Sequence, residues 1–293
     1  MDTFFDNYIH NIQKVDNRLD EYIKDPNEKN IHDMRTAIRR LEASYISSPK
    51  QIRKRKIIEY VIKSKHLFAI NSEIRDFDII LEKLTKEGQL DIQQLEQIEK
   101  SIIKSKNRKL KKALSIARDL RKVNAPHLDN YNNKYDLSIL QKKITKRYNK
   151  IVSKFANKIE KNIPIVISSS EKLDELHEVR KDSKKLRYLL ELLLNNRDRY
   201  EGNIDKNSVK GENNHSNEQN VGNLIEQLKK IQDMLGNTRD YDITIAYLKQ
   251  HDRQKNVVTK MNLILQRKNK YDQFVHYYKS AISNIDNNFL IPK

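Results

Sequence analysis

Two segments of the chain carry the same arrangement of basic side chains. Each has a histidine, an arginine three positions later, a basic residue after seven positions and a leucine after nine. Residues three and four apart share one face of an α-helix, so each segment aligns its basic groups in a stripe. Arginine and lysine form charge-assisted hydrogen bonds to phosphate, and histidine donates when neutral and adds charge when protonated. The stripes therefore indicate polyanion binding that strengthens as the pH falls; they comprise His32, Arg35 and Arg39, and His177, Arg180 and Lys184.

A second motif, Arg-Asp-aromatic-Asp, follows each stripe, at Arg75–Asp78 and at Arg239–Asp242. Two motifs that recur in the same order indicate an internal duplication. The distance from histidine to arginine is 43 residues (75 − 32) in the first copy and 62 (239 − 177) in the second. A polar, asparagine-rich stretch from about 202 to 222 is long enough to hold the excess, and we expect it to form a surface loop.

The composition predicts an all-helical protein. Only 5 Gly and 5 Pro occur in 293 residues, too few turn formers for a sandwich or barrel rich in strands. The chain has no cysteine, which excludes disulfides and cysteine-ligated metal sites. It also lacks an apolar run of the roughly 18 residues that would span a bilayer. Because the N-terminus does not resemble a signal peptide, we expect a soluble, cytoplasmic protein without membrane association.

The net charge is +18, from 58 Lys and Arg against 40 Asp and Glu, and the pI is about 9.7. Such a field attracts polyanions: nucleic acid, an anionic membrane or a linear phosphate polymer. A lysine-rich, solvated helical surface would have the same charge. The charge therefore permits polyanion binding without identifying the partner.

Apolar spacing places the stripes on helices in two bundles, residues 1–124 and 135–293, joined by a linker at 125–134. In the first bundle we expect a helix at 4–24 and a second helix for which Asp25-Pro26 provides the cap and a first-turn proline. Further helices are expected at 51–69, from the Arg-Asp motif onward, and at 90–122. In the second we expect helices at 135–162, 173–194 and 224–235, followed by two more, the last at 254–284. The segment 163–170, which contains Pro164, is expected to be a buried loop.

Each basic stripe borders a predicted buried face. The apolar positions around the first stripe are Ile31, Met34, Ile38, Leu41 and Tyr45, and those around the second are Leu176, Val179, Leu186, Leu190 and Leu193. Aligned cations repel one another, and the stripes themselves contain few acids, so a bound anion would neutralise them. A single histidine beside an apolar face is usually a core residue, but the repetition favours a functional face.

The four motif aspartates, Asp76, Asp78, Asp240 and Asp242, are expected to cap helices or orient arginines. Residues two apart do not share a helix face, so we predict no metal site. The offset between the motifs aligns Lys65 with Lys229, which would extend the basic face. The cluster Arg53–Lys56 has no counterpart and is interpreted as solvated surface.

The order of these motifs resembles the CHAD family, the conserved histidine α-helical domain. The segments that carry the resemblance are Ile31–Leu41, Glu73–Ile79, Leu176–Tyr188 and Leu228–Gly236. The resemblance implies two helical bundles related by a pseudo-twofold axis, with a basic groove or pore between them that binds inorganic polyphosphate. It implies contacts from His32, Arg35, Arg39, Lys65, Arg75, His177, Arg180, Lys184, Arg187, Lys229 and Arg239. Arg40 and Lys185 lie further round the helix and are weaker candidates.

Two further features qualify this expectation. Glu42 stands where Arg187 stands in the second copy, so the first half would bind less strongly. Family members are often fused to a triphosphatase domain, but no Glu-x-Glu-x-Lys signature occurs here. We therefore expect a stand-alone binding module, without turnover or cofactor, that is associated with polyphosphate granules. Its oligomeric state is left open.

Two alternative functions are also compatible with the sequence. A non-specific RNA or DNA binder fits the charge, although the scattered tyrosines form no evident stacking platform. A metal-dependent phosphohydrolase is indicated only by the dipeptides His32-Asp33 and His251-Asp252. Further ordered His and Asp ligands are not identifiable, which disfavours this class.

Overall fold

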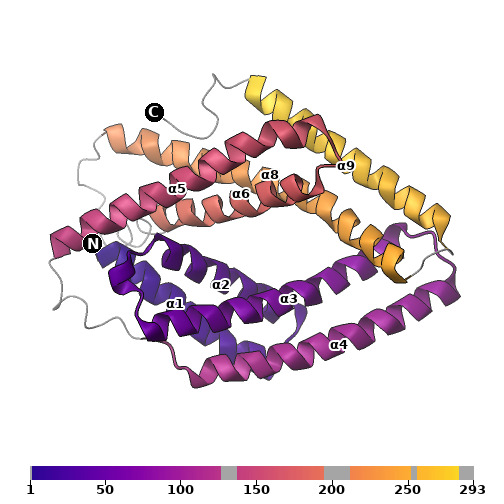
Figure 1. Cartoon of the computed structure of the whole chain (residues 1–293), viewed down its shortest axis with the longest axis horizontal. Coiled ribbons are helices and arrows are strands. Elements are labelled where there is room, and N and C mark those ends of the chain that lie inside the picture. Colours follow the sequence, from indigo (N-terminus) through magenta and orange to yellow (C-terminus); the bar gives the residue numbers. More distant parts are fainter. Residues whose placement is uncertain (1, 127–136, 195–211, 252–255, 284–293) are drawn as a thin grey trace. The chain divides into compact units, whose positions relative to one another are not determined.

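The structure is a computed structural model that describes residues 2–126, 137–194, 212–251 and 256–283. Every regular element in these ranges is helical, which confirms the all-α prediction (Figure 1). The elements are α1 Asp2–Lys24, α2 Glu28–Ser47, the 3₁₀ turn η1 Lys50–Ile52, α3 Arg55–Glu87, α4 Ile92–Lys122, α5 Leu137–Ser168, α6 Leu173–Leu194, α8 Glu212–His251 and α9 Val257–Ser283.

The chain forms two compact units, each assembled from separate stretches of sequence. Unit 1 consists of Met1–Phe68, Leu114–Lys158 and Asp182–Lys229, and unit 2 of Ala69–Ala113, Ile159–Lys181 and Lys230–Lys293. Helices α3, α4, α5, α6 and α8 each begin in one unit and end in the other. Both units therefore take residues from either side of the predicted linker at 125–134. The predicted division into repeats at 1–124 and 135–293 stays a prediction, and most of the linker lies outside the described residues.

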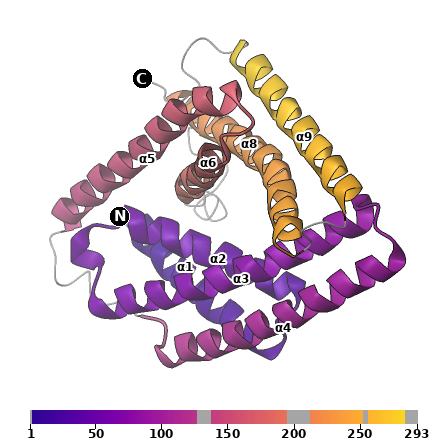
Figure 2. The same ribbon diagram turned by 45° about the vertical axis from the view of Figure 1, so that its right-hand side comes forward.

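Helices α1 and α2 lie side by side in unit 1 (Figure 2). Apolar residues of α1 repeat every three or four positions, as in Ile12, Val15 and Leu19, and are fully buried or nearly so. The predicted apolar face of α2 is buried except for Tyr45, which is half-buried. That of α6 is buried at Leu176, Val179, Leu186 and Leu190, whereas the side chain of Leu193 lies outside the described part. Each fully buried leucine or isoleucine contributes about 1.5–3 kcal/mol.

The ends of α2 differ from the sequence prediction. Its N-cap is Asn27, whose side chain accepts a hydrogen bond from the Asn30 backbone, and not Asp25-Pro26. At the other end, Arg53 donates to the Ile46 and Ser48 carbonyls at 3.1 and 2.9 Å and lies over the Tyr45 ring. The last carbonyls of a helix lack intrahelical donors, so this arginine completes the terminus of α2. Arg53 is therefore not solvated surface, whereas Lys54, Arg55 and Lys56 of the same cluster are exposed as predicted.

The core of unit 2 joins four helices. Ile80 and Leu84 of α3, Ile102 of α4 and Leu263 of α9 pack together with three residues of α8: Tyr241, Ile245 and Leu248. Figure 2 shows α9 beside the C-terminal part of α8. This packing fixes the second half of α3 against α8, the two helices that carry the Arg-Asp-aromatic-Asp motifs.

Helices α3 and α8 are longer than predicted. The first motif lies within α3 instead of opening a new helix, and the second lies within α8. No proline occurs inside either helix, and apolar packing continues through both motifs. Residues 212–222, predicted to be part of a surface loop, form the first turns of α8, whereas 202–211 lie outside the described residues.

Helix α5 continues through the segment predicted to be a loop. Pro164 lies inside the helix, which ends at Ser168. Proline removes one backbone donor, and the last carbonyls of any helix also need partners. The hydroxyl of Tyr271 on α9 donates to the carbonyls of Val166 and Ile167 at 2.8 and 3.0 Å. This long-range contact stabilises the end of α5.

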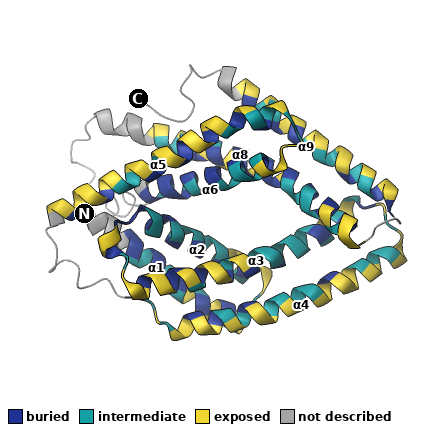
Figure 3. Cartoon of the chain, in the orientation of Figure 1, coloured by how far each residue is buried: buried dark blue, intermediate teal, exposed yellow. Residues whose placement is uncertain are grey.

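Burial differs between the helices (Figure 3). Most of α2 and α6 is buried or half-buried, whereas α4 and α9 have broad exposed faces. Across the described ranges, none of the helices is both long and apolar enough to cross a membrane. The histidine stripes thus lie on two of the less exposed helices.

Candidate functional site

Unit 2 brings together residues of both motif types. His177 and Arg180 come from the first turns of α6, Arg239 from the middle of α8, and Arg75 and Asp76 from α3. Nη2 of Arg239 lies 3.8 Å from Oδ2 of Asp76. This separation is that of an ion pair without a hydrogen bond, and it favours the arginine-orienting role, one of the two roles that the sequence left open for Asp76.

The His177 imidazole lies in a positive electrostatic field. Its pKa is lowered to about 4, first by burial and then by Arg239, Lys181 and Arg180. Its Nδ1 is buried and has no hydrogen-bond partner among the described residues. At neutral pH the ring is therefore uncharged, because three nearby cations and desolvation oppose protonation. An anion bound here would favour the protonated imidazole and so raise the pKa of His177.

Asp240 is the acidic member of the same cluster. Burial raises its pKa to about 6, and Arg180, Lys83 and Arg75 act in the opposite direction. Asp76 adds a small upward contribution. The carboxylate is thus close to several cations and yet costly to ionise, which leaves the cluster with an excess of positive charge.

Gly236 of α8 lies under the Arg180 side chain. A β-carbon at this position would be 3.5 Å from Nε and 3.6 Å from Nη2 of Arg180. The guanidinium therefore rests against the α8 backbone, one turn before Arg239. The contact links two of the segments from which the sequence prediction was made.

The second aspartate of each motif binds a base on another helix. Asp78 accepts from Lys106 of α4 at 2.5 Å, and Asp242 accepts from Arg267 of α9 at 2.5 Å. Because both motifs lie within helices, the alternative role of capping was wrong for all four aspartates. Lys106 and Arg267 were missed from the sequence, since neither belongs to a repeated motif.

Unit 1 contains the first stripe. His32 is exposed, while Arg35 and Arg39 are half-buried. Both guanidinium groups lie over the ring of Phe68 on α3, at 5.7 and 4.9 Å from its centroid. Phe68 was not predicted from the sequence, because only the packing of α3 on α2 places it beneath the stripe. Cation–π contacts of this kind stabilise by about 0.5–1 kcal/mol when exposed.

Glu42 provides a counter-charge in unit 1. It lies 2.9 Å from Lys65, whose side chain is 48% exposed. Glu42 is the residue that replaces the second copy's Arg187, and this ion pair reduces the charge of Lys65 that remains for a ligand. The exposed pair itself contributes only about 0–1 kcal/mol to stability.

Acidic residues also accompany the second stripe in unit 1. Arg187 donates to Glu191 at 2.7 Å and lies 4.5 Å from the centroid of the Tyr188 ring. Arg40 lies 3.9 Å from the same carboxylate. Neighbouring acids therefore neutralise part of the basic set, although the stripes themselves contain few acids.

The remaining candidates divide between the units. Lys184 is half-buried in unit 1, and Lys229 is exposed there, 3.7 Å from Glu226. Unit 2 groups four of the predicted residues, Arg75, His177, Arg180 and Arg239; unit 1 contains His32, Arg35, Arg39, Lys65, Lys184, Arg187 and Lys229. Within the described ranges, no three His, Asp or Glu side chains converge as a metal-binding group.

The protein-family model of the CHAD domain matches residues 8–200 of the chain. The chain belongs to the CHAD family. The crystal structure of the CHAD domain from the plant Ricinus communis has the same fold, with a TM-score of 0.56. The two proteins are 13% identical over 94% of this chain and 91% of that chain. At this identity the CHAD structure establishes the fold alone. Comparison with curated proteins gave no match.

Proposed function

We propose that the protein binds inorganic polyphosphate through the basic residues of its two histidine stripes and of the motifs that follow them. The family is associated with polyphosphate binding, which supports this partner. The observation that carries the proposal is the His177 cluster, in which burial, Arg239, Lys181 and Arg180 together lower the pKa of the imidazole to about 4. Such a field, partly shielded from water, favours a ligand with densely spaced negative charge.

The carboxylates of the cluster fit the same role. Asp76 orients Arg239, while Asp240 is costly to ionise despite its cationic neighbours. Below about pH 6, where Asp240 is protonated, a phosphate oxygen can therefore approach with less repulsion than two charged carboxylates would impose. Arginine forks match phosphate geometry, so a polymer with a charge on each phosphate can form many charge-assisted hydrogen bonds.

A nucleic-acid ligand has less support. Single-stranded nucleic acids gain affinity by stacking bases on aromatic side chains. Phe68, the aromatic ring beneath the first stripe, is already in contact with Arg35 and Arg39. Such a surface favours phosphate over bases, and a polyphosphate chain has no bases to leave unbound.

The pairs Asp78–Lys106 and Asp242–Arg267 support an internal duplication. Each connects the last residue of an Arg-Asp-aromatic-Asp motif to a base on the next long helix, α4 in one case and α9 in the other. We propose that the two copies derive from one repeat and that both supply cations to a polyphosphate groove. Binding would occur without turnover, in the cytoplasm, at polyphosphate granules.

Calorimetric titration of the full chain with long-chain polyphosphate tests the proposal, with single-stranded RNA of comparable total charge as competitor at physiological salt. We expect saturable binding that the RNA does not displace. Equal or tighter RNA binding would instead identify a generic polyanion surface. Release of phosphate on addition of Mg²⁺ or Mn²⁺ would contradict binding without turnover.

A further inference from the structure

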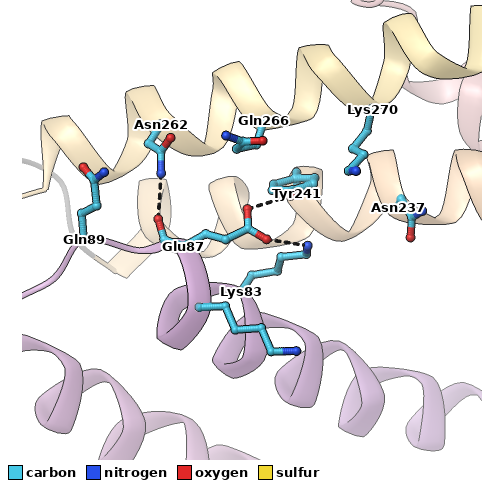
Figure 4. A pocket seen from close by; sticks show the side chains of 9 residues that line it. Lys83, Glu87, Gln89, Asn237, Tyr241, Asn262, Gln266 and Lys270 are labelled. Carbon is cyan, nitrogen blue, oxygen red and sulfur yellow. Dashed lines mark hydrogen bonds and ion pairs between the residues drawn. The ribbon is translucent and has the colours of Figure 1, made fainter.

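An open, polar cavity of about 820 Å³ lies within unit 2. It adjoins the His177 cluster, because Lys83 lines the cavity and also acts on Asp240. Its wall is formed by the end of α3, the middle of α8 and the first half of α9 (Figure 4). Lys83, Lys86 and Lys270 supply positive charge, and Glu87 supplies one carboxylate. The lysines and the glutamate give the wall a net charge of +2. Tyr241, the aromatic residue of the second Arg-Asp-aromatic-Asp motif, also lines the cavity, but none of the basic residues inferred to bind polyphosphate does.

Side-chain amides make up much of the remaining wall. Gln89, Asn237, Asn262 and Gln266 come from three different parts of unit 2. Figure 4 shows Gln266 and Lys270 of α9 directed toward the side where Lys83 and Glu87 of α3 lie. Each amide both donates and accepts hydrogen bonds. Such groups match a ligand that itself carries both donors and acceptors.

The carboxylate of Glu87 is fixed in place and ionised. Tyr241 donates to it at 2.7 Å and Lys83 at 3.0 Å. Burial opposes ionisation, but these two hydrogen bonds outweigh it and lower the Glu87 pKa. The remaining lone pairs of the Glu87 carboxylate require a ligand that donates hydrogen bonds. A phosphate chain, which presents acceptors at neutral pH, cannot satisfy them.

Side-chain hydrogen bonds to backbone carbonyls hold together the helices that line the cavity. Asn262 donates to the Glu87 carbonyl at 2.8 Å, and Thr259 donates to the Gly88 carbonyl. These bonds fasten α9 to the end of α3. The cavity is therefore a preformed feature of unit 2, within the range of 300–1,000 Å³ typical of small-molecule sites.

We propose that this cavity binds a small phosphorylated polyol, such as a sugar phosphate. The lysines would bind the phosphate monoester, whose charge of about −2 at neutral pH matches the wall. Glu87 and the amides would bind the hydroxyl groups, which donate and accept. This ligand class differs from polyphosphate because it requires hydroxyl donors, and the inference does not depend on the proposed function.

The test is calorimetric titration of the full chain with glucose 6-phosphate and with glycerol 3-phosphate, alongside inorganic phosphate and triphosphate. The double variant Gln266→Ala, Lys270→Ala removes one amide and one cation from the wall. The double variant Lys268→Ala, Asn269→Ala removes the same kinds of group from exposed positions of α9 and serves as the matched control.

We expect saturable binding of at least one polyol phosphate. The cavity variant should lose about tenfold or more in affinity, which corresponds to 1.4 kcal/mol, and the control variant should lose none. No binding of either polyol phosphate up to about 10 mM would overturn the proposal. Equal losses in the two variants, or tighter cavity-dependent binding of triphosphate, would overturn it as well. Polyphosphate binding measured on the same variants reports separately on the proposed function.

Discussion

Arg267 of α9 donates from Nε to Oδ1 of Asp242 on α8 at 2.5 Å, and from Nη2 to the Ser170 carbonyl at 2.7 Å. One guanidinium thus joins α9, α8 and the turn that precedes α6, the helix of His177. The arginine side chain is 12% exposed and that of Asp242 is 24% exposed. The charge pair is therefore largely removed from water, and loss of one partner leaves the other poorly solvated.

The substitution Arg267→Gln should destabilise the protein by about 2 kcal/mol, because it leaves Asp242 without its cation in a partly buried site. Urea denaturation measures the effect. Lys268→Gln removes the same charge from an exposed neighbouring position and should change the free energy of unfolding by less than about 0.5 kcal/mol. Equal effects of the two substitutions would contradict a structural role for the Arg267–Asp242 pair.

Two glycines should respond in opposite directions to alanine. At Gly88, a β-carbon would lie 2.2 Å from the Leu84 carbonyl oxygen of the same α3 terminus, so Gly88→Ala requires a backbone shift. We expect destabilisation of about 2–4 kcal/mol. At Gly222, within α8, an added β-carbon would have no atom within 4 Å apart from its chain neighbours and the backbone of its own helix. Gly222→Ala should therefore stabilise by up to about 1 kcal/mol through helix propensity. Thermal denaturation of both variants distinguishes this pattern from a uniform loss.

The stability of the protein should depend on Asp240. Its folded pKa of about 6 lies above the ordinary value of 3.8, so the folded state binds the proton more tightly than the unfolded state. This contribution to stability is complete below about pH 4 and is lost as the pH rises through 6. Asp240→Asn should consequently stabilise at pH 7, by about 1–3 kcal/mol. Asp233→Asn, at an exposed position of the same helix, should have little effect.

His177 acts in the opposite sense on stability. Its folded pKa of about 4 lies below the ordinary 6.5, so its contribution is present above pH 6.5 and is lost as the pH falls toward 4. His177→Gln should therefore flatten the loss of stability between these pH values. Denaturation midpoints across this range measure it. An unchanged pH profile would show that His177 is not held neutral by its surroundings.

Protonation of Asp240 and of His177 should both strengthen polyphosphate binding. As the pH falls, Asp240 loses negative charge near 6 and His177 gains positive charge, so both changes strengthen binding. A bound anion also raises the histidine pKa, which causes proton uptake on binding. Calorimetry in buffers of different ionisation enthalpy measures this uptake. Asp240→Asn should remove the component centred near pH 6, and a variant that retains it would refute this assignment.

The buried faces and several helix bounds could be predicted from local sequence. Helix α6 begins and ends as predicted, at Leu173 and Leu194, because its apolar spacing is regular. The grouping of Arg180 with Arg239 also followed from the repetition of two motifs. Local patterns succeed here because neighbouring residues on one helix determine which face is buried.

Long-range contacts explain what local sequence could not predict. Pro164 remains helical where Tyr271, far along the chain, satisfies the carbonyls that follow it. The counter-charges Glu42 and Glu191 and the ring of Phe68 gain their roles only through packing. The cavity residues of unit 2 come from three helices and the segment after α3, and apart from Tyr241 they belong to no repeated motif. Such sites become visible only when the fold is known.

In the proposed function, the stripe arginines bind polyphosphate more strongly than net charge alone would provide. Its most direct test compares Arg35→Gln, Arg180→Gln with Lys142→Gln, Lys146→Gln, two exposed lysines of α5, in titrations with long-chain polyphosphate at several salt concentrations. We expect the arginine variant to lose at least about tenfold more affinity than the lysine variant and to show the shallower salt dependence. Equal losses in the two variants would contradict the claim.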